Sequence, residues 1–323
     1  MIIGQDKAVG QFASAWAKRA LHHAWLLSGP RGVGKAHFAR MAATRVLADG
    51  AGPDTDMPGL DCGEDHPIAR LVSAGSHPDL RMLERLENPK TGNLARSITV
   101  DQVRSLGGLI GSTPFLSPWR AVVIDCADDL EPGGANALLK MLEEPPANTI
   151  FLLVAHAPGR LLPTIRSRCR RLDFQLLDDA AMTSILEAQA PAQSSSERQE
   201  IVALAGGSVG RAMAFAALDL GKLQFAAVQI IRRGDPTNGD RSALATELGK
   251  KGAADRYAAF LALLPALVAK EVRSLSGAQR SRALDAYGKV RELTAAAPRL
   301  SLDPAATIFQ LGGILATVAN PLS

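Results

Sequence analysis

One stretch of sequence decides the fold of the first part of this chain: Gly29-Pro30-Arg31-Gly32-Val33-Gly34-Lys35-Ala36. It matches the phosphate-binding pattern G-x-x-x-x-G-K-[ST] at every position but the last. The glycines of this pattern let backbone N–H groups surround a phosphate, the lysine contacts the β- and γ-phosphates, and the final hydroxyl holds Mg²⁺. Because Ala36 has no hydroxyl, the sequence predicts a phosphate loop without its direct metal ligand.

The residues around the loop predict an α/β fold. Residues 23–28 form a short apolar run, typical of a buried parallel strand, and residues 35–46 have the spacing of a helix. Four further strands are expected at residues 80–83, 121–125, 150–155 and 171–174. Because these apolar runs alternate with helical segments, we expect a parallel sheet with helices on both faces.

Length and composition narrow the class of protein. A chain of 323 residues that is 47% hydrophobic is long enough for two or three domains. There is no apolar run long enough for a membrane span and no signal-peptide pattern at the start, and the three scattered cysteines suggest a reducing compartment. We therefore expect a cytoplasmic protein without a membrane partner. The net charge of +4 favours at most a local nucleic-acid groove.

A second motif ends the strand expected at residues 121–125. Asp125 stands where NTPases place a carboxylate near Mg²⁺, and the next residue is normally a glutamate that activates the attacking water. Here that residue is Cys126. A thiol with an ordinary pKa of about 8.5 is a poor base at neutral pH, so Cys126 is interpreted as a small, partly apolar filler. Together, Ala36 and Cys126 predict that the chain does not hydrolyse ATP.

The remaining motifs lie after residue 130. Residues 135–142 place apolar side chains on one face of a helix that Pro145 and Pro146 end. An apolar strand follows, and then Ser167-Arg168-Cys169. After residue 178 the strand pattern disappears, and the chain is rich in alanine and leucine at helical spacing, as in Phe260, Leu263, Leu264, Leu267 and Val268.

Five of these segments together resemble the bacterial clamp-loader subunits of the AAA+ superfamily: HAWLLSGP, NALLKMLEEPP, FLLVA, LLPTIRSRC and GGSVGRA. The resemblance is dense from Gly4 to about Met213. It implies a RecA-like AAA+ domain at 1–175, a small helical lid at 176–224 and an all-α C-terminal collar at 225–323. The collar would join a ring with gamma/tau and delta subunits, and the ring would act on a sliding clamp and primed-template DNA.

The resemblance also implies a role for Arg168. In Ser167-Arg168-Cys169, this residue matches the family's arginine finger, which acts in trans on ATP held by a neighbouring gamma or tau subunit. A planar guanidinium directed at a γ-phosphate stabilises transition-state charge. The alternative is that Arg166, Arg168, Arg170 and Arg171 form a solvated basic edge.

The resemblance implies two alternative functions. The first is a non-hydrolysing stator subunit within the DNA polymerase III holoenzyme, with a degenerate nucleotide site of Gly29, Gly32, Gly34, Lys35 and Asp125 that binds ATP or ADP weakly or not at all. This subunit requires no cofactor. The alternative is an active AAA+ ATPase, either a motor subunit of a clamp loader or part of a helicase-like ring. Ala36 and Cys126 favour the stator, and the intact Lys35 loop keeps the motor open.

The other family positions are altered as well. Many relatives carry a four-cysteine zinc module before a Gly-x-His-Pro-Asp segment. This chain keeps Gly75-Ser76-His77-Pro78-Asp79 but only Cys62, with His66 nearby, so neither zinc nor another metal is expected. His156 is either a γ-phosphate-sensing residue or a loop histidine. Arg211 follows Gly210, which stands where motor subunits have their sensing arginine.

Overall fold

The structure is a computed structural model that describes residues 2–53, 55, 57, 59–87, 94–218 and 220–319. The chain divides into two compact units, 1–177 and 178–323. The three-domain division stays a prediction. Its second border, at 224/225, falls inside helix α11 (Gly221–Arg233). Because a continuous helix leaves no linker there, a border between lid and collar is better drawn before Gly221.

The first unit contains a five-stranded parallel sheet in the order β2-β3-β4-β1-β5. The strands are β1 (Ala24–Ser28), β2 (Leu80–Leu83), β3 (Arg120–Ile124), β4 (Thr149–Ala155) and β5 (Arg170–Asp173). All five strands lie within about one residue of the positions expected from the sequence, and the predicted parallel α/β fold is confirmed. Three of them, β1, β3 and β4, are buried at every residue, because helices cover both faces of the sheet.

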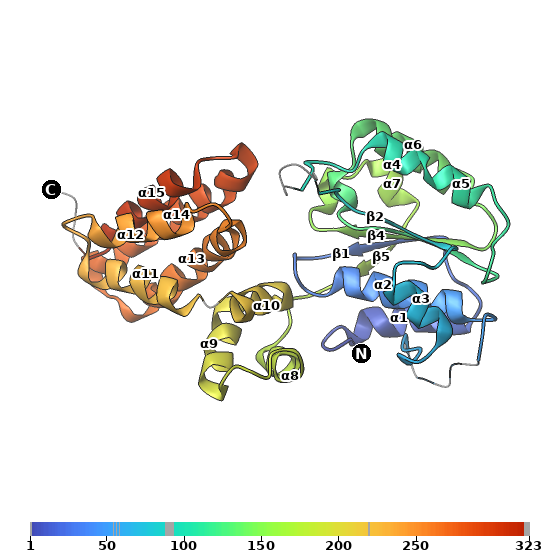
Figure 1. Cartoon of the computed structure of the whole chain (residues 1–323), viewed down its shortest axis with the longest axis horizontal. Coiled ribbons are helices and arrows are strands. Elements are labelled where there is room, and N and C mark those ends of the chain that lie inside the picture. The colour runs from blue at the N-terminus through green and yellow to red at the C-terminus, as the bar shows by residue number, and fades with distance from the viewer. Residues whose placement is uncertain are drawn as a thin grey trace. The chain divides into compact units, whose positions relative to one another are not determined.

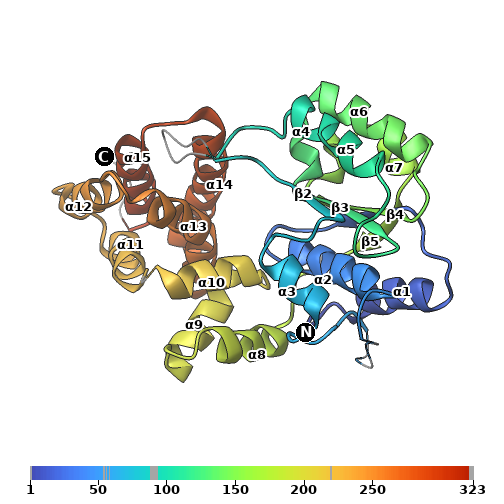
Figure 2. The same ribbon diagram turned by 45° about the vertical axis from the view of Figure 1, so that its right-hand side comes forward.

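Two groups of helices cover the sheet (Figure 1 and Figure 2). One face is covered by α1 (Asp6–Ala17), α2 (Lys35–Ala48) and α3 (Pro67–Ser73), and the other by α4 (Val100–Arg104), α5 (Leu106–Ile110), α6 (Pro132–Glu143) and α7 (Pro163–Ser167). The two short 3₁₀ helices are η1 (Ala127–Asp129) and η2 (Pro158–Arg160). Beneath the first group, the Phe38 ring packs edge-on against Phe12 and Phe174. Beneath the second, Leu138 and Phe151 belong to one buried apolar cluster.

The strand register defines two edges of the sheet. Ser28 lies beside Ala155, so the phosphate loop and His156 leave the sheet together, at what we call the carboxyl edge. Asp125, which follows β3, leaves at the same edge because Ile124 lies beside Leu153. Trp25 lies beside Arg170, so the chain that enters β5 comes from the opposite side, which we call the amino edge.

The described part of the second unit contains helices and no strand, as the sequence predicts. The helices are α8 (Asp179–Gln189), α9 (Ser195–Ala205), α10 (Val209–Ala217), α11 (Gly221–Arg233), α12 (Gly239–Leu248), α13 (Ala254–Ser274), α14 (Gly277–Leu300) and α15 (Pro304–Ala316). The apolar face predicted for α13 is buried throughout: Phe260, Leu263, Leu264, Leu267 and Val268 are each at most 1% exposed.

Within the described residues, no single helix is both long and apolar enough to cross a membrane, and only the bent pair of α10 and α11 meets the length and composition criteria jointly. The location of the protein in the cell stays a prediction.

Candidate functional site: a degenerate nucleotide site and an arginine at the opposite edge

The phosphate loop connects β1 to α2 with the backbone shape that its glycines predict. Gly29, Gly32 and Gly34 all have positive φ angles, of 152°, 78° and 94°. At Gly29 a Cβ atom would clash with the carbonyl oxygen of Phe174, whereas at Gly34 it would meet nothing within 4 Å. Gly29 is therefore required by packing as well as by backbone conformation.

The Lys35 side chain turns back onto its own loop. Its ammonium donates to the carbonyl oxygen of Gly29 at 2.7 Å and also to that of Pro30. The residue is only 2% exposed, and burial lowers its pKa to about 8, although the nearby Asp128 and Asp125 carboxylates favour the charged form. The group that would contact phosphates is thus paired with backbone oxygens, which resemble phosphate oxygens as acceptors.

Asp125 and Cys126 lie next to this loop at the carboxyl edge. The Asp125 backbone N–H donates to the carbonyl oxygen of Leu83, which fixes the turn that leaves β3. The backbone of Cys126 has a left-handed conformation, with a φ of 61°. Its Sγ lies 3.3 Å from Nε2 of His156 and 3.9 Å from Oδ1 of Asp125. The fold thus brings both side chains to the degenerate site, while the interpretations of Cys126 as a filler and of His156 as a loop histidine stay predictions.

The contact between Cys126 and His156 is between neutral groups. Burial, with a smaller contribution from Asp125, raises the pKa of the Cys126 thiol. Burial and the positive charges of Lys35 and Arg31 lower the pKa of His156. A catalytic thiol needs the opposite shifts, toward a thiolate and an imidazolium. The pair is consequently no activated nucleophile.

Asp128 is a site residue that the sequence analysis missed. Its carboxylate accepts hydrogen bonds from the backbone N–H groups of His156, at 3.1 Å, and Ala157, at 3.0 Å. These bonds tie the end of β4 to the turn after β3. The only signal in the sequence is a second acid three positions after Asp125.

Arg168 lies at the amino edge, between α7 and β5. One guanidinium nitrogen is 3.0 Å from Oε1 of Glu143, at the end of α6, and another donates to the Thr164 carbonyl oxygen at 3.0 Å. The two charged side chains are 36% and 43% exposed. Arg168 is thus held in one direction by its own subunit while remaining accessible to solvent.

The neighbouring arginines have different surroundings. The Arg170 guanidinium carbon lies 5.0 Å from the ring centroid of Trp25, and Arg171 pairs with Asp173 at 2.7 Å. Both contacts lie within β5 or against the adjacent strand. Because Arg166, Arg170 and Arg171 are exposed and Arg168 is half-buried, the alternative of a solvated basic edge stays open.

The segment around Cys62 and His66, where the family resemblance implies a zinc module, makes contacts within the fold. His66 caps α3, since its Nδ1 accepts from the Ile68 backbone N–H at 3.2 Å, and Cys62 donates to the Leu60 carbonyl oxygen. Asp79 accepts from three backbone N–H groups, of Phe115, Leu116 and Ser117, at 2.6–2.9 Å. The Gly-x-His-Pro-Asp segment thereby anchors the loop before β3.

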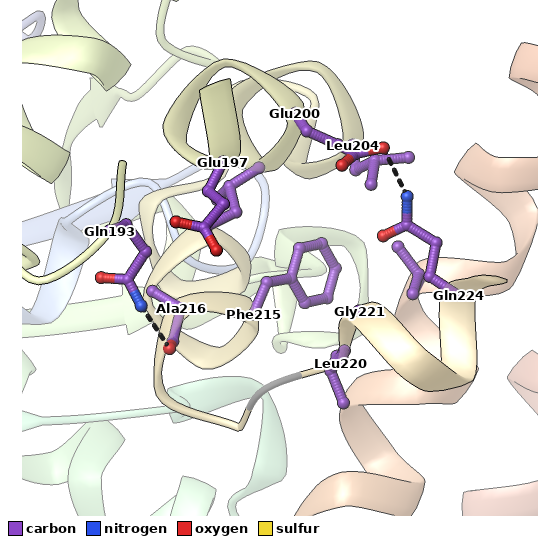
Figure 3. A pocket seen from close by; sticks show the side chains of 11 residues that line it. Gln193, Glu197, Glu200, Leu204, Phe215, Ala216, Leu220, Gly221 and Gln224 are labelled. Atoms are coloured by element: carbon purple, nitrogen blue, oxygen red, sulfur yellow. Dashed lines mark hydrogen bonds between the residues drawn. The ribbon is translucent and has the colours of Figure 1, made fainter. Parts of the chain in front are cut away.

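In the second unit, a cavity of about 210 Å³ opens between α9, α10, α11 and α13 (Figure 3). Its apolar wall includes Leu204, Phe215 and Leu220, and its polar groups are paired internally. Gln193 donates to the Ala216 carbonyl oxygen, and Gln224 donates to Glu200. Arg211 lies near the start of α10 and does not line the cavity. Its backbone N–H donates to the side-chain oxygen of Ser208, which caps the helix, at 3.4 Å. The cavity holds none of the predicted site residues.

Comparison with known proteins identifies the family of the chain. A family model described as "DNA polymerase III, delta subunit" matches residues 4–178. The delta-prime subunit of DNA polymerase III from Pseudomonas aeruginosa is 40% identical over 194 residues, which are 59% of this chain and 55% of that protein. The delta-prime subunit from Haemophilus influenzae is 32% identical over 201 residues, 62% of this chain and 56% of that one. The matches thus span little more than half the length of these relatives.

A solved structure supports the fold of the whole chain. A gamma-subunit-related protein of DNA polymerase III from Thermotoga maritima covers 97% of this chain and 100% of its own, with a TM-score of 0.52 and 14% identity. At that identity the likeness shows the fold alone, a parallel sheet with helices followed by a helical region. The family model covers more than half of the residues, and the chain is 40% and 32% identical to the two delta-prime subunits over the matched parts. The chain therefore belongs to the delta-prime family of DNA polymerase III clamp-loader subunits.

Proposed function

We propose that this protein is a non-hydrolysing stator of the clamp loader, which supplies Arg168 in trans to ATP held by a neighbouring gamma or tau subunit. The observation that carries this proposal is the separation of Arg168 from its own phosphate loop. Arg168 precedes β5 at the amino edge, and the loop follows β1 at the carboxyl edge. Four residues of strand, roughly 13 Å, separate the two edges. Arg168 therefore serves only a nucleotide on another subunit.

The carboxyl edge supports the other half of the proposal. Ala36 offers no hydroxyl to Mg²⁺, Cys126 is a neutral thiol in place of the catalytic glutamate, and Lys35 is paired with its own loop. Two steps of hydrolysis, metal binding and water activation, lack their side chains. By itself the chain is therefore no ATPase, and Gly29, Gly32, Gly34, Lys35 and Asp125 bind ATP or ADP weakly at most.

The second unit supports assembly. Apolar side chains remain exposed on its helices, including Phe225 on α11 at 66%, Leu284 on α14 at 53% and Leu300 at 63%. We propose that residues of this unit join gamma/tau and delta subunits in the ring, and that the ring brings the protein to the sliding clamp and primed-template DNA. Replacing Leu284 and Leu300 by glutamate would then weaken co-elution with gamma/tau on a sizing column, without unfolding the chain.

ATP turnover by the purified chain tests the stator function. We expect no turnover, and at most weak turnover in an Ala36→Ser/Cys126→Glu variant. DNA-stimulated turnover by the unmodified chain that disappears in Lys35→Ala would instead establish the alternative, an active motor subunit.

A further inference from the structure

We propose that the degenerate nucleotide site is a zinc site, with Asp125, Cys126 and His156 as its three protein ligands. A carboxylate oxygen, a sulfur and a ring nitrogen from these residues all lie within 4.8 Å of one another. The site differs in place and residues from the cysteine module of other family members, since Cys62 and His66 take no part in it. It also goes beyond the stator function, which needs no metal.

The distances between the donor atoms suit a tetrahedral zinc ion. Zinc bonds of about 2.3 Å to sulfur and about 2.0 Å to nitrogen or oxygen place two ligands about 3.5 Å apart. Here Sγ of Cys126 is 3.3 Å from Nε2 of His156 and 3.9 Å from Oδ1 of Asp125. These two distances differ from the tetrahedral spacing by tenths of an ångström, and all three donor atoms lie within 4.8 Å of one another.

The donor set selects zinc over the magnesium of an ordinary nucleotide site. A thiolate and an imidazole are ligands that zinc prefers, whereas magnesium takes oxygen ligands almost exclusively. On binding, the Cys126 thiol loses its proton to solvent and its sulfur bonds to the ion. The thiolate and the Asp125 carboxylate then carry two negative charges, which balance a divalent cation. A water molecule would complete the fourth position.

The backbone holds the ligands in place. Asp125 and Cys126 are consecutive residues after β3, and His156 directly follows β4, the strand beside it. Asp128 accepts from the backbone N–H of His156 at 3.1 Å and so fixes the approach of the imidazole. All three ligand residues are half-buried, so an ion can enter from solvent. Asp128 is consequently a positioning residue.

Cobalt and zinc titrations of the full chain under a non-thiol reductant test the proposal. We expect one Co²⁺ per chain with the absorption of a cobalt–thiolate bond, displaced by one equivalent of Zn²⁺. Cys126→Ala and His156→Ala should each weaken Zn²⁺ binding by more than about 100-fold, and Asp128→Asn by about 10-fold. Matched controls are Cys62→Ser and Cys169→Ser, which remove the other two cysteines and should leave affinity unchanged.

Two results would overturn the site. If the wild type binds Co²⁺ no better than Cys126→Ala, the contact between Cys126 and His156 is only a hydrogen bond. If the cobalt–thiolate absorption persists in Cys126→Ala and disappears in Cys62→Ser, the metal binds elsewhere. Cys126→Ser guards against a misfolded variant: it preserves the side-chain shape, so a folded protein, judged by circular dichroism, should lose the thiolate band.

Discussion

The two edges of the parallel sheet differ in the burial and the contacts of their charged side chains. At the carboxyl edge, Lys35 is buried and hydrogen-bonded to its own loop, and Cys126 contacts His156. At the amino edge, Arg168 is partly exposed and held by Glu143. The first edge keeps the backbone of a phosphate site without its chemistry, and the second holds Arg168 without a phosphate site. Backbone shape and side-chain chemistry are thus separable.

A physical reason for this separation lies in Gly29. The loop packs against Phe174, so its backbone path is part of the core of the first unit. Replacing Ala36 or Cys126 leaves that packing intact, whereas a side chain at position 29 does not. A protein can therefore lose hydrolysis and still need the loop.

The largest expected effect concerns the amino edge. Arg168→Ala should lower ATP hydrolysis at the neighbouring site by a factor on the order of 10³–10⁵, because the transition state loses its guanidinium. ATPase activity of the whole complex, measured at saturating clamp and primed DNA, should fall only in part, since other sites have their own neighbours. Arg168→Lys should restore little, because an ammonium lacks the planar fork.

The matched control for this experiment is Arg166→Ala, two residues earlier at the end of α7. It should leave both assembly and hydrolysis unchanged. Equal ATPase activity of the wild-type and Arg168→Ala complexes would mean that Arg168, at the amino edge, contributes nothing to ATP hydrolysis on the neighbouring subunit.

The next prediction concerns the contribution of the phosphate loop, at the carboxyl edge, to the stability of the fold. Gly29→Ala should lower the free energy of unfolding by about 3 kcal/mol or more, because its methyl group clashes with the Phe174 carbonyl oxygen at a positive φ. Gly34→Ala, with a positive φ but nothing within 4 Å, should cost only about 1–2 kcal/mol. Urea unfolding compares them, and similar losses would contradict a packing role for Gly29.

A smaller effect should follow the titration of Lys35. Its folded pKa of about 8 lies below the ordinary value of 10.5, so between these values the unfolded state binds more protons. Folding stability should therefore rise with pH across this window, by at most about 1.4 kcal/mol per unit, and be lost as pH falls toward 8. The difference in unfolding free energy between the wild type and Lys35→Met, measured with urea, should show this rise with pH. A difference that does not change with pH would mean that the Lys35 ammonium is solvated in the folded protein.

The smallest effect concerns the pair at the amino edge. Glu143→Gln removes an ion pair between side chains that are 36% and 43% exposed, so stability should change by less than about 1 kcal/mol. If Glu143 orients Arg168, ATPase activity of the complex should fall a few-fold. Glu144→Gln, at the adjacent position, is the control. An unchanged ATPase activity would show that Arg168 finds its direction without Glu143.

Much of the first unit could be predicted from local patterns. Three of the strands, β1, β3 and β4, are short and mostly apolar runs that are buried at every residue, as expected for strands with helices on both faces of the sheet. The phosphate loop was predictable because glycine adopts its positive φ angles more readily than any other residue. The border proposed at 224/225 falls inside α11, and the division into three domains stays a prediction.

The contacts of the site were not predictable in the same way. Cys126 and His156 are 30 positions apart, and their meeting depends on β3 and β4 being neighbours in register. Glu143 and Arg168 belong to two known motifs, yet neither motif indicates that they pair across α6 and α7. Asp128 accepts hydrogen bonds from backbone N–H groups of another turn, and the residue types at that turn do not indicate such bonds.

By itself, the sequence determined the parallel α/β unit, the helical unit, the phosphate loop and the missing hydroxyl and glutamate, because these depend on residue type and short-range spacing. Only the tertiary structure decided that Arg168 and the phosphate loop occupy opposite edges, and that Asp125, Cys126 and His156 share one. Strand order and register bring distant side chains together through long-range packing, which no local pattern encodes.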